Sequence, residues 1–184
     1  AMGYSHATGI PLKRPYSKYT PTWPRSFMPQ SQDMRELVAK MKLIPNKAII
    51  KDKRGIFLDD SIVRGTQLKD NVKDLHEAGI REVNMRIACP PLTYPCEFVN
   101  FSRSRSSLDL ATHRAVRQIE NKEGADMKVY SDCKSEQYKA MVDVIREELN
   151  LTSLTFQELN DLVKAIGLPK EKLCTHCWDG SSYF

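Results

Sequence analysis

The chain has 184 residues, of which 41% are hydrophobic and 28% charged, with a formal net charge of +5. This composition indicates one soluble, globular domain with a real core rather than a disordered chain. Its apolar runs are too short to cross a bilayer, and its basic residues are too scattered to indicate nucleic-acid binding. No signal peptide is visible, which favours a cytoplasmic protein, and an odd count of five cysteines favours metal ligands or free thiols over disulfides.

Residues 1–35 are rich in proline, tyrosine and arginine, and prolines at this spacing forbid a regular helix. We therefore predict a mobile loop over most of this segment, followed by a short helix from Asp33 to Leu43. Strands are predicted at Lys47 to Lys51 and at Gly55 to Asp59. The second is a continuous apolar run, which is typical of a strand buried on both faces.

A helix is predicted from about Thr66 to Ala78, with Gly79 placed as the glycine that ends it. Arg81 to Ala88 alternates apolar and polar residues, which indicates the next strand. A strand, a helix and a second strand with such short connections form one βαβ unit. This pattern predicts a parallel sheet in an α/β fold.

Beyond Pro90-Pro91 the pattern becomes helical. Helices are predicted at Ser104 to Glu120 and at Lys134 to Leu149. Thr155-Phe156-Gln157-Glu158 has the form of a capping box that opens a third helix, which Gly167 and Pro169 end. We therefore expect an α/β core over residues 1–100 and a helical C-terminal region over residues 101–184.

The chemistry-bearing motif is the segment that follows the second strand, Leu58-Asp59-Asp60-Ser61-Ile62-Val63-Arg64-Gly65-Thr66. Ligands of open α/β sheets bind at the carboxyl ends of strands. A helix N-terminus preceded by a glycine and hydroxyl side chains suits a phosphate, while two carboxylates suit vicinal hydroxyls or a hydrated Mg²⁺. A sugar phosphate would use both halves of the loop, whereas a bare Asp-Asp pair would be better explained as an acidic helix cap.

This nonamer resembles the phosphoribosyl-diphosphate (PRPP) motif of type I phosphoribosyltransferases, in the form found in amidophosphoribosyltransferases. Other segments look like landmarks of the same family in the same order: Gly9-Ile10-Pro11, Arg25-Ser26-Phe27-Met28, Ser31-Gln32, Lys40-Met41-Lys42-Leu43, Ala78-Gly79, Arg86-Ile87-Ala88-Cys89-Pro90-Pro91, Tyr94-Pro95-Cys96 and Lys172-Leu173-Cys174-Thr175-His176-Cys177. The resemblance implies an incomplete type I phosphoribosyltransferase sheet with a helical C-terminal appendage. It also implies the synthesis of phosphoribosylamine from PRPP and glutamine-derived ammonia in purine synthesis, by a homo-oligomer.

Carried over to this sequence, the resemblance places Asp59 and Asp60 on the ribose hydroxyls and on Mg²⁺. It places Arg25 on a loop that closes over PRPP, and Lys42, with Lys40, near the pyrophosphate. The 5-phosphate would be wrapped by the rest of the motif, chiefly through backbone N–H groups: Ser61, Val63, Arg64, Gly65 and Thr66.

The spacing Cys174-x-x-Cys177 is common in metal sites but is not specific alone. With Cys96, it resembles the ligand set of a 4Fe–4S cluster in one subclass of the family. Such a cluster needs a fourth ligand, which the resemblance places in upstream sequence that is absent here; Cys133 or Cys89 could substitute for it, although no spacing favours either. Zinc is the alternative metal, with His176 as a less favoured ligand.

The glutaminase domain and the pyrophosphate loop of the family have no counterpart in this sequence. We therefore expect either a fragment of a longer protein, with these parts upstream, or a split or truncated gene product. In each case we expect the isolated chain to make no phosphoribosylamine from glutamine. Two other functions stay open: a regulator that binds PRPP without turnover, and a metal-stabilised interaction module in which the acids are incidental.

Overall fold

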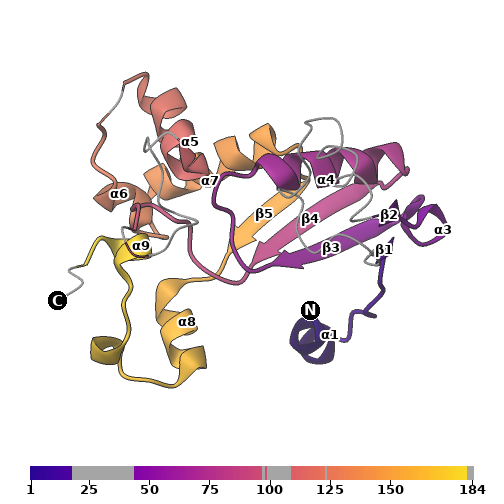
Figure 1. The fold of residues 1–184 in the computed structure, drawn as a ribbon, viewed down its shortest axis with the longest axis horizontal. Coiled ribbons are helices and arrows are strands. Elements are labelled where there is room, and N and C mark those ends of the chain that lie inside the picture. The colour runs from indigo at the N-terminus through magenta and orange to yellow at the C-terminus, as the bar shows by residue number, and fades with distance from the viewer. Residues whose placement is uncertain (18–43, 97, 99–108, 123, 182–184) are drawn as a thin grey trace, which may run out of the picture. The chain divides into compact units, whose positions relative to one another are not determined.

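The computed structural model describes residues 1–17, 44–96, 98, 109–122 and 124–181 (Figure 1). The chain divides into two compact units, Ala1–Gly55 with Asn71–Glu82 and Ile56–Asp70 with Val83–Phe184. In these described ranges, no helix has the length and apolar character that crossing a membrane requires. The division that we expect near residue 100 stays a prediction.

In the first unit, α1 (Met2–Thr8) is followed by a short antiparallel pair of β1 (Tyr16–Ser17) with β2 (Ile44–Pro45). Helix α3 (Lys47–Ile50) occupies the place where the sequence predicts a strand, so that prediction is wrong. The reason is local: the Asn46 side chain accepts the Ala48 N–H at 3.1 Å and caps a helical turn.

The sheet of the βαβ unit has the strand order β3-β4-β5, which Figure 1 shows as three strands side by side. Its strands are β3 (Arg54–Asp59), β4 (Glu82–Ile87) and β5 (Ser153–Phe156), and α4 (Thr66–Glu77) connects the first two. Strands β4 and β5 are parallel, with Met85 opposite Leu154. The predicted parallel sheet of an α/β fold is therefore confirmed.

The third strand occupies a segment for which the sequence predicts a helix start. In β5, Leu154 and Phe156 are buried whereas Thr155 is exposed, which is the two-residue period of a strand. Pairing with β4 overrides the capping-box signature of Thr155. Helix α8 (Leu159–Ile166) begins later, with Glu158 as its N-cap, and ends at Gly167 as predicted.

Strand β3 is less buried than its apolar sequence predicts, since Leu58 is 37% exposed. Among the described strands β3 lies at an edge of the sheet, so part of its surface lacks a neighbouring strand. The central strand β4 instead alternates as expected, with Val83, Met85 and Ile87 all buried.

Two helices of the second unit, α5 (Ala111–Glu120) and α7 (Glu136–Glu148), pack together through buried apolar side chains that include Ala115, Met141 and Ile145. They confirm the helices predicted in these regions. Residues 104–108 of the first prediction lie outside the described part. The remaining helical elements are α6 (Lys128–Ser131), a 3₁₀ turn (Lys170–Lys172) and α9 (His176–Asp179).

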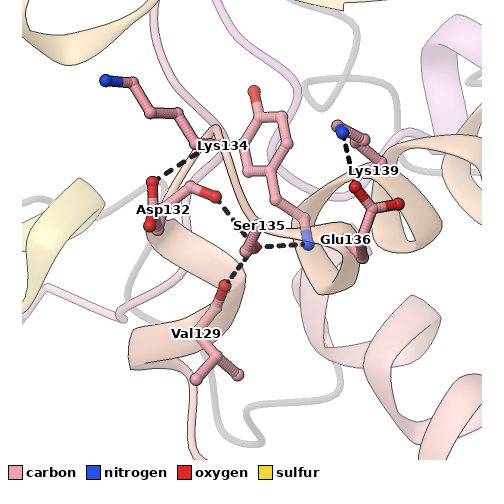
Figure 2. Close-up of polar contacts among 7 residues, drawn as sticks. Val129, Asp132, Lys134, Ser135, Glu136 and Lys139 are labelled. Carbon is pink, nitrogen blue, oxygen red and sulfur yellow. Dashed lines mark hydrogen bonds and ion pairs between the residues drawn. The ribbon is translucent and has the colours of Figure 1, made fainter.

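The start of α7 is fixed by Ser135, as Figure 2 shows. The Ser135 hydroxyl accepts the Tyr138 N–H at 2.9 Å, and it lies 2.6 Å from the Val129 carbonyl and 2.9 Å from that of Asp132. Such a side-chain cap satisfies N–H groups that the first helical turn leaves unpaired. The opposite end of α7 approaches the predicted phosphate loop.

Candidate functional site

The two predicted acids lie at the carboxyl end of β3. The Asp59 carbonyl accepts the Ala88 N–H at 2.9 Å, which ties this strand end to the residue that follows β4. The Asp60 N–H donates to Asp59 Oδ1 at 2.9 Å, and the Ser61 hydroxyl donates to Asp60 Oδ1 at 3.3 Å. Both acids are exposed, so their remaining oxygens are open to a ligand.

The carboxyl of Asp59 has a raised pKa. Partial burial is the main cause, and the adjacent Asp60 charge adds to it, while the Asp60 N–H acts in the opposite direction. Two neighbouring carboxylates therefore repel each other at neutral pH, and a bound cation or a set of hydroxyl donors would relieve this repulsion.

Two carbonyl groups of the loop from Ser61 to Thr66 accept hydrogen bonds from backbone N–H groups of α5 and α4. The Val63 carbonyl accepts the Ala111 N–H at 2.9 Å, and the Gly65 carbonyl accepts the Lys69 N–H at 2.9 Å. By contrast, the backbone N–H groups of residues 61–66 donate to no other described residue. Free N–H groups at a helix start suit an anion, and the assignment of these positions to a phosphate stays a prediction.

Two residues shape the loop. Ile62 is 5% exposed and anchors it in the core. Gly65 has a left-handed φ of +75°, and a Cβ added there would lie 3.3 Å from Leu149 Cδ2. Glycine is thus required at Gly65 by its backbone conformation, with crowding as a second factor.

We expect Gly65→Ala to lower the free energy of unfolding by about 1–2 kcal/mol, because alanine is strained at positive φ. Urea denaturation measures this loss. Gly3→Ala is the control, because Gly3 has a negative φ and no atom within 4 Å of the added Cβ. Equal stability of the Gly65 and Gly3 variants would contradict the strained loop.

The predicted pyrophosphate-side residues Arg25, Lys40 and Lys42 lie outside the described part of the chain. Their assignment remains a prediction from the resemblance.

The predicted cysteine ligands lie where the C-terminal segment meets residues 93–96. The N–H groups of Thr93 and Tyr94 donate to the Cys177 carbonyl at 2.9 and 3.1 Å, and the Thr93 hydroxyl donates to the Trp178 carbonyl at 2.8 Å. These bonds attach α9 to the segment that carries Cys96, which is only 5% exposed.

Burial, followed by the neighbouring thiols of Cys96 and Cys174, raises the pKa of Cys177 to about 12. The three predicted ligands are therefore neighbours. In the part of the chain that the structure describes, however, no three histidine, cysteine or acidic side chains are arranged to hold a metal ion. His176 Nδ1 lies 2.7 Å from the Ser181 carbonyl.

The two candidates for a fourth ligand lie in different surroundings. Burial raises the pKa of Cys89 to about 11, and Asp60 and Asp59 contribute to this rise, so Cys89 lies near the acidic end of β3. The pKa of Cys133 is raised by burial and by Glu158. Neither observation places either thiol beside Cys177.

We expect Cys177 to react slowly with iodoacetamide, because only the thiolate attacks and a raised pKa keeps the thiol neutral. At pH 8 the rate should be at least about tenfold below that of free cysteine, and it should rise as pH approaches 12. Mass spectrometry of timed samples measures it, with urea-unfolded protein as the control. Equal rates in the folded and unfolded protein would contradict this environment.

Sequence reasoning missed two neighbours of the site. Arg114 on α5 donates to the Arg64 carbonyl at 2.7 Å. Trp178 lies beside Cys89, and its buried indole N–H has no regular hydrogen-bond partner among the described residues. Neither residue belongs to a motif, and each is far in sequence from the site residue that it contacts.

Comparison with known proteins gives one consistent family. No family model matches the chain. The amidophosphoribosyltransferases of Methanothermobacter thermautotrophicus and Mycobacterium bovis are 31% and 32% identical, each over 98% of the chain. That of Pyrococcus horikoshii is 39% identical over 71%. The chain spans about a third of the length of these curated relatives, from 28% to 32%.

Two solved structures agree. One, described as the allosteric regulatory enzyme of purine biosynthesis, matches 99% of the chain with a TM-score of 0.69 and 30% identity. The other, glutamine PRPP amidotransferase from B. subtilis complexed with ADP and GMP, matches 100% with a TM-score of 0.68 and 29% identity. The chain covers 34% and 35% of these two proteins. In sequence and fold, the chain is therefore a homologue of the C-terminal, phosphoribosyltransferase part of the amidophosphoribosyltransferases.

Proposed function

We propose that this chain is the PRPP-binding portion of an amidophosphoribosyltransferase, a glycosyltransferase that forms 5-phosphoribosylamine from PRPP and glutamine-derived ammonia. One observation carries the proposal: the free N–H groups of residues 61–66 directly follow two exposed carboxylates. A ribose 5-phosphate has an anion at one end and two vicinal hydroxyls near the other, so it complements both parts of this loop.

In this proposal Asp59 and Asp60 accept hydrogen bonds from the ribose hydroxyls, and the loop from Ser61 to Thr66 receives the 5-phosphate. Their contribution is to orient the sugar so that ammonia can displace pyrophosphate at C1. Such a displacement passes through an oxocarbenium-like state, which a site stabilises by position and charge. Arg25 and Lys42 would act on the pyrophosphate side.

The two acids also suit magnesium, because carboxylate oxygens are the ligands that this hard cation prefers. When bound with substrate phosphates, magnesium neutralises their charge. Asp59 and Asp60 are the side chains that would hold it. The pKa of Asp59, raised chiefly by partial burial and further by the Asp60 charge, supports this role.

The assignment to an iron–sulfur subclass is a finer proposal. A 4Fe–4S cluster would use Cys96, Cys174 and Cys177, and the proximity of these thiols supports it. Against it, the described residues include no group of three side chains arranged for a metal, and a fourth ligand is not identified. We therefore derive no step from a cluster or from zinc at this position.

The assignments beyond the PRPP site concern the neighbouring domain, the oligomeric state and the location of the protein, and they are based on the relatives' names and greater length. We propose that the chain acts beside a glutaminase domain in a cytoplasmic homo-oligomer, with PRPP as substrate and without nucleic acid or a membrane. The covered third of each relative leaves room for such a domain.

The melting temperature of the chain tests the proposal. Saturating PRPP with Mg²⁺ should raise it by about 5 °C or more, since a ligand that binds only the folded state stabilises that state. Inorganic pyrophosphate with Mg²⁺, which lacks the ribose, should have a smaller effect. No shift with PRPP would overturn the proposal.

A metal-stabilised interaction module is the second candidate, and the neighbouring cysteines favour it. Under that reading, Zn²⁺ or Fe²⁺ would raise the melting temperature whereas PRPP would not. Turnover of PRPP with ammonia by the whole protein would separate the enzyme from a regulator that only binds PRPP.

A further inference from the structure

Arg114 reaches the phosphate loop from the protein side. One terminal nitrogen, NH2, donates to the Arg64 carbonyl at 2.7 Å and to Glu148 Oε1 at 3.0 Å. The other, NH1, donates to the Asp109 carbonyl at 3.0 Å. One guanidinium group thus joins the loop, the segment before α5 and the end of α7.

These contacts determine which way the loop peptides point. In a planar trans peptide, the carbonyl of one residue and the N–H of the next point in opposite directions. Holding the Arg64 carbonyl toward Arg114 therefore directs the Gly65 N–H toward the opposite side. In the same way, the bond from Ala111 to the Val63 carbonyl directs the Arg64 N–H away from α5.

Fixing the orientation of these peptides matters because Gly65 makes the loop backbone flexible. Glycine crosses between left- and right-handed backbone conformations at little cost, so the Arg64–Gly65 peptide could turn over without a strong bond to its carbonyl. A turned peptide would present a carbonyl oxygen to the anion in place of an N–H. A hydrogen bond from a charged donor opposes that rotation more strongly than one from a neutral donor.

Glu148 completes the arrangement from the end of α7. The Arg114 and Glu148 side chains are 33% and 32% exposed, so their ion pair is only partly screened by water. The next residue, Leu149, approaches Gly65. The end of α7 thus contacts both Arg114 and the loop glycine.

We infer that Arg114, held by Glu148, is a positioning residue that keeps the Arg64 carbonyl turned away from the bound 5-phosphate. The inference rests on the proposed ribose 5-phosphate site. It assigns the helices beyond residue 108 a role in substrate binding, although Arg114 does not touch the substrate.

Calorimetric titration of the full chain with ribose 5-phosphate tests the inference. Arg114→Ala should weaken binding about tenfold, the expected cost of losing a charged hydrogen bond that orders the loop. Arg114→Lys should recover part of this loss, because an ammonium can still donate to the Arg64 carbonyl. Glu148→Gln, which leaves residue 114 an arginine but removes the charge that holds its side chain, should weaken binding about threefold and provides a second measurement should Arg114→Ala not fold.

Arg146→Ala is the matched control. Its side chain is 29% exposed and pairs with Asp143 and Glu147 on α7, with no bond to the loop. The inference is supported if Arg114→Ala and Glu148→Gln both weaken binding and Arg114→Lys weakens it less than Arg114→Ala. The control Arg146→Ala should then bind as tightly as the unmodified chain. Unchanged affinity in these Arg114 and Glu148 variants overturns the inference alone, whereas failure of the unmodified chain to bind overturns the proposed function with it.

Discussion

The Asp60→Asn variant is expected to bind PRPP with Mg²⁺ about 100-fold more weakly than the unmodified chain. Asparagine keeps the size of the side chain but removes the charge that strengthens hydrogen bonds from ribose hydroxyls and attracts the cation. The fold should be retained, because Asp60 is exposed and its one described side-chain bond comes from Ser61. Isothermal titration calorimetry measures the affinity, and thermal melting checks the fold.

Asp70→Asn is the control for this prediction. Asp70 is an exposed carboxylate on α4, one turn beyond the loop, so its replacement changes the net charge equally without removing a proposed ligand. A 100-fold loss for Asp60 with little change for Asp70 would support a specific contact. Equal affinities in the two variants would remove Asp60 from the site.

The Gly180→Ala variant is expected to lower the free energy of unfolding by about 2–3 kcal/mol and to loosen α9. Gly180 has a φ of +69°, and an added Cβ would lie 2.7 Å from Tyr94 Cζ and 2.9 Å from its Cε1. The cost combines backbone strain with overlap against a ring. Urea denaturation gives the stability, and faster alkylation of the buried Cys96 would report the loosening.

Gly167→Ala separates the two causes. Gly167 has a similar φ of +75°, but nothing lies within 4 Å of its added Cβ. It should therefore cost only the backbone strain, about 1 kcal/mol. If Gly180→Ala were no more destabilising than Gly167→Ala, the close packing of α9 on Tyr94 would be contradicted.

Local sequence patterns predicted the parts of the fold that local interactions determine. The alternation in β4 and the helix ends at Gly79 and Gly167 are of this kind. Strand β5 could not be predicted in this way, because Thr155 begins a strong capping signature and becomes a strand residue only through pairing with Arg86. The turn at α3 depended on one Asn46 cap that the apolar pattern obscured.

In the candidate site, too, the features set by local sequence could be predicted, whereas those that depend on distant residues could not. Asp59, Asp60 and Gly65 are adjacent in sequence, so their shared loop was visible as a motif. The role of Arg114 could not be predicted, because it donates to a backbone carbonyl 50 residues away in sequence. Every residue has such a carbonyl, so the sequence does not indicate which one accepts a hydrogen bond. Likewise, Trp178 comes near Cys89 only because α9 attaches to residues 93 and 94.

Backbone amide NMR of the full chain tests the central claim most directly. Ribose 5-phosphate added with Mg²⁺ should shift the amide resonances of residues 61–66, since these N–H groups are the proposed phosphate donors. The amides around Cys174 and Cys177 should move little. Saturable shifts confined to the loop would support a ribose phosphate site there, whereas an unchanged loop at millimolar ligand would contradict it.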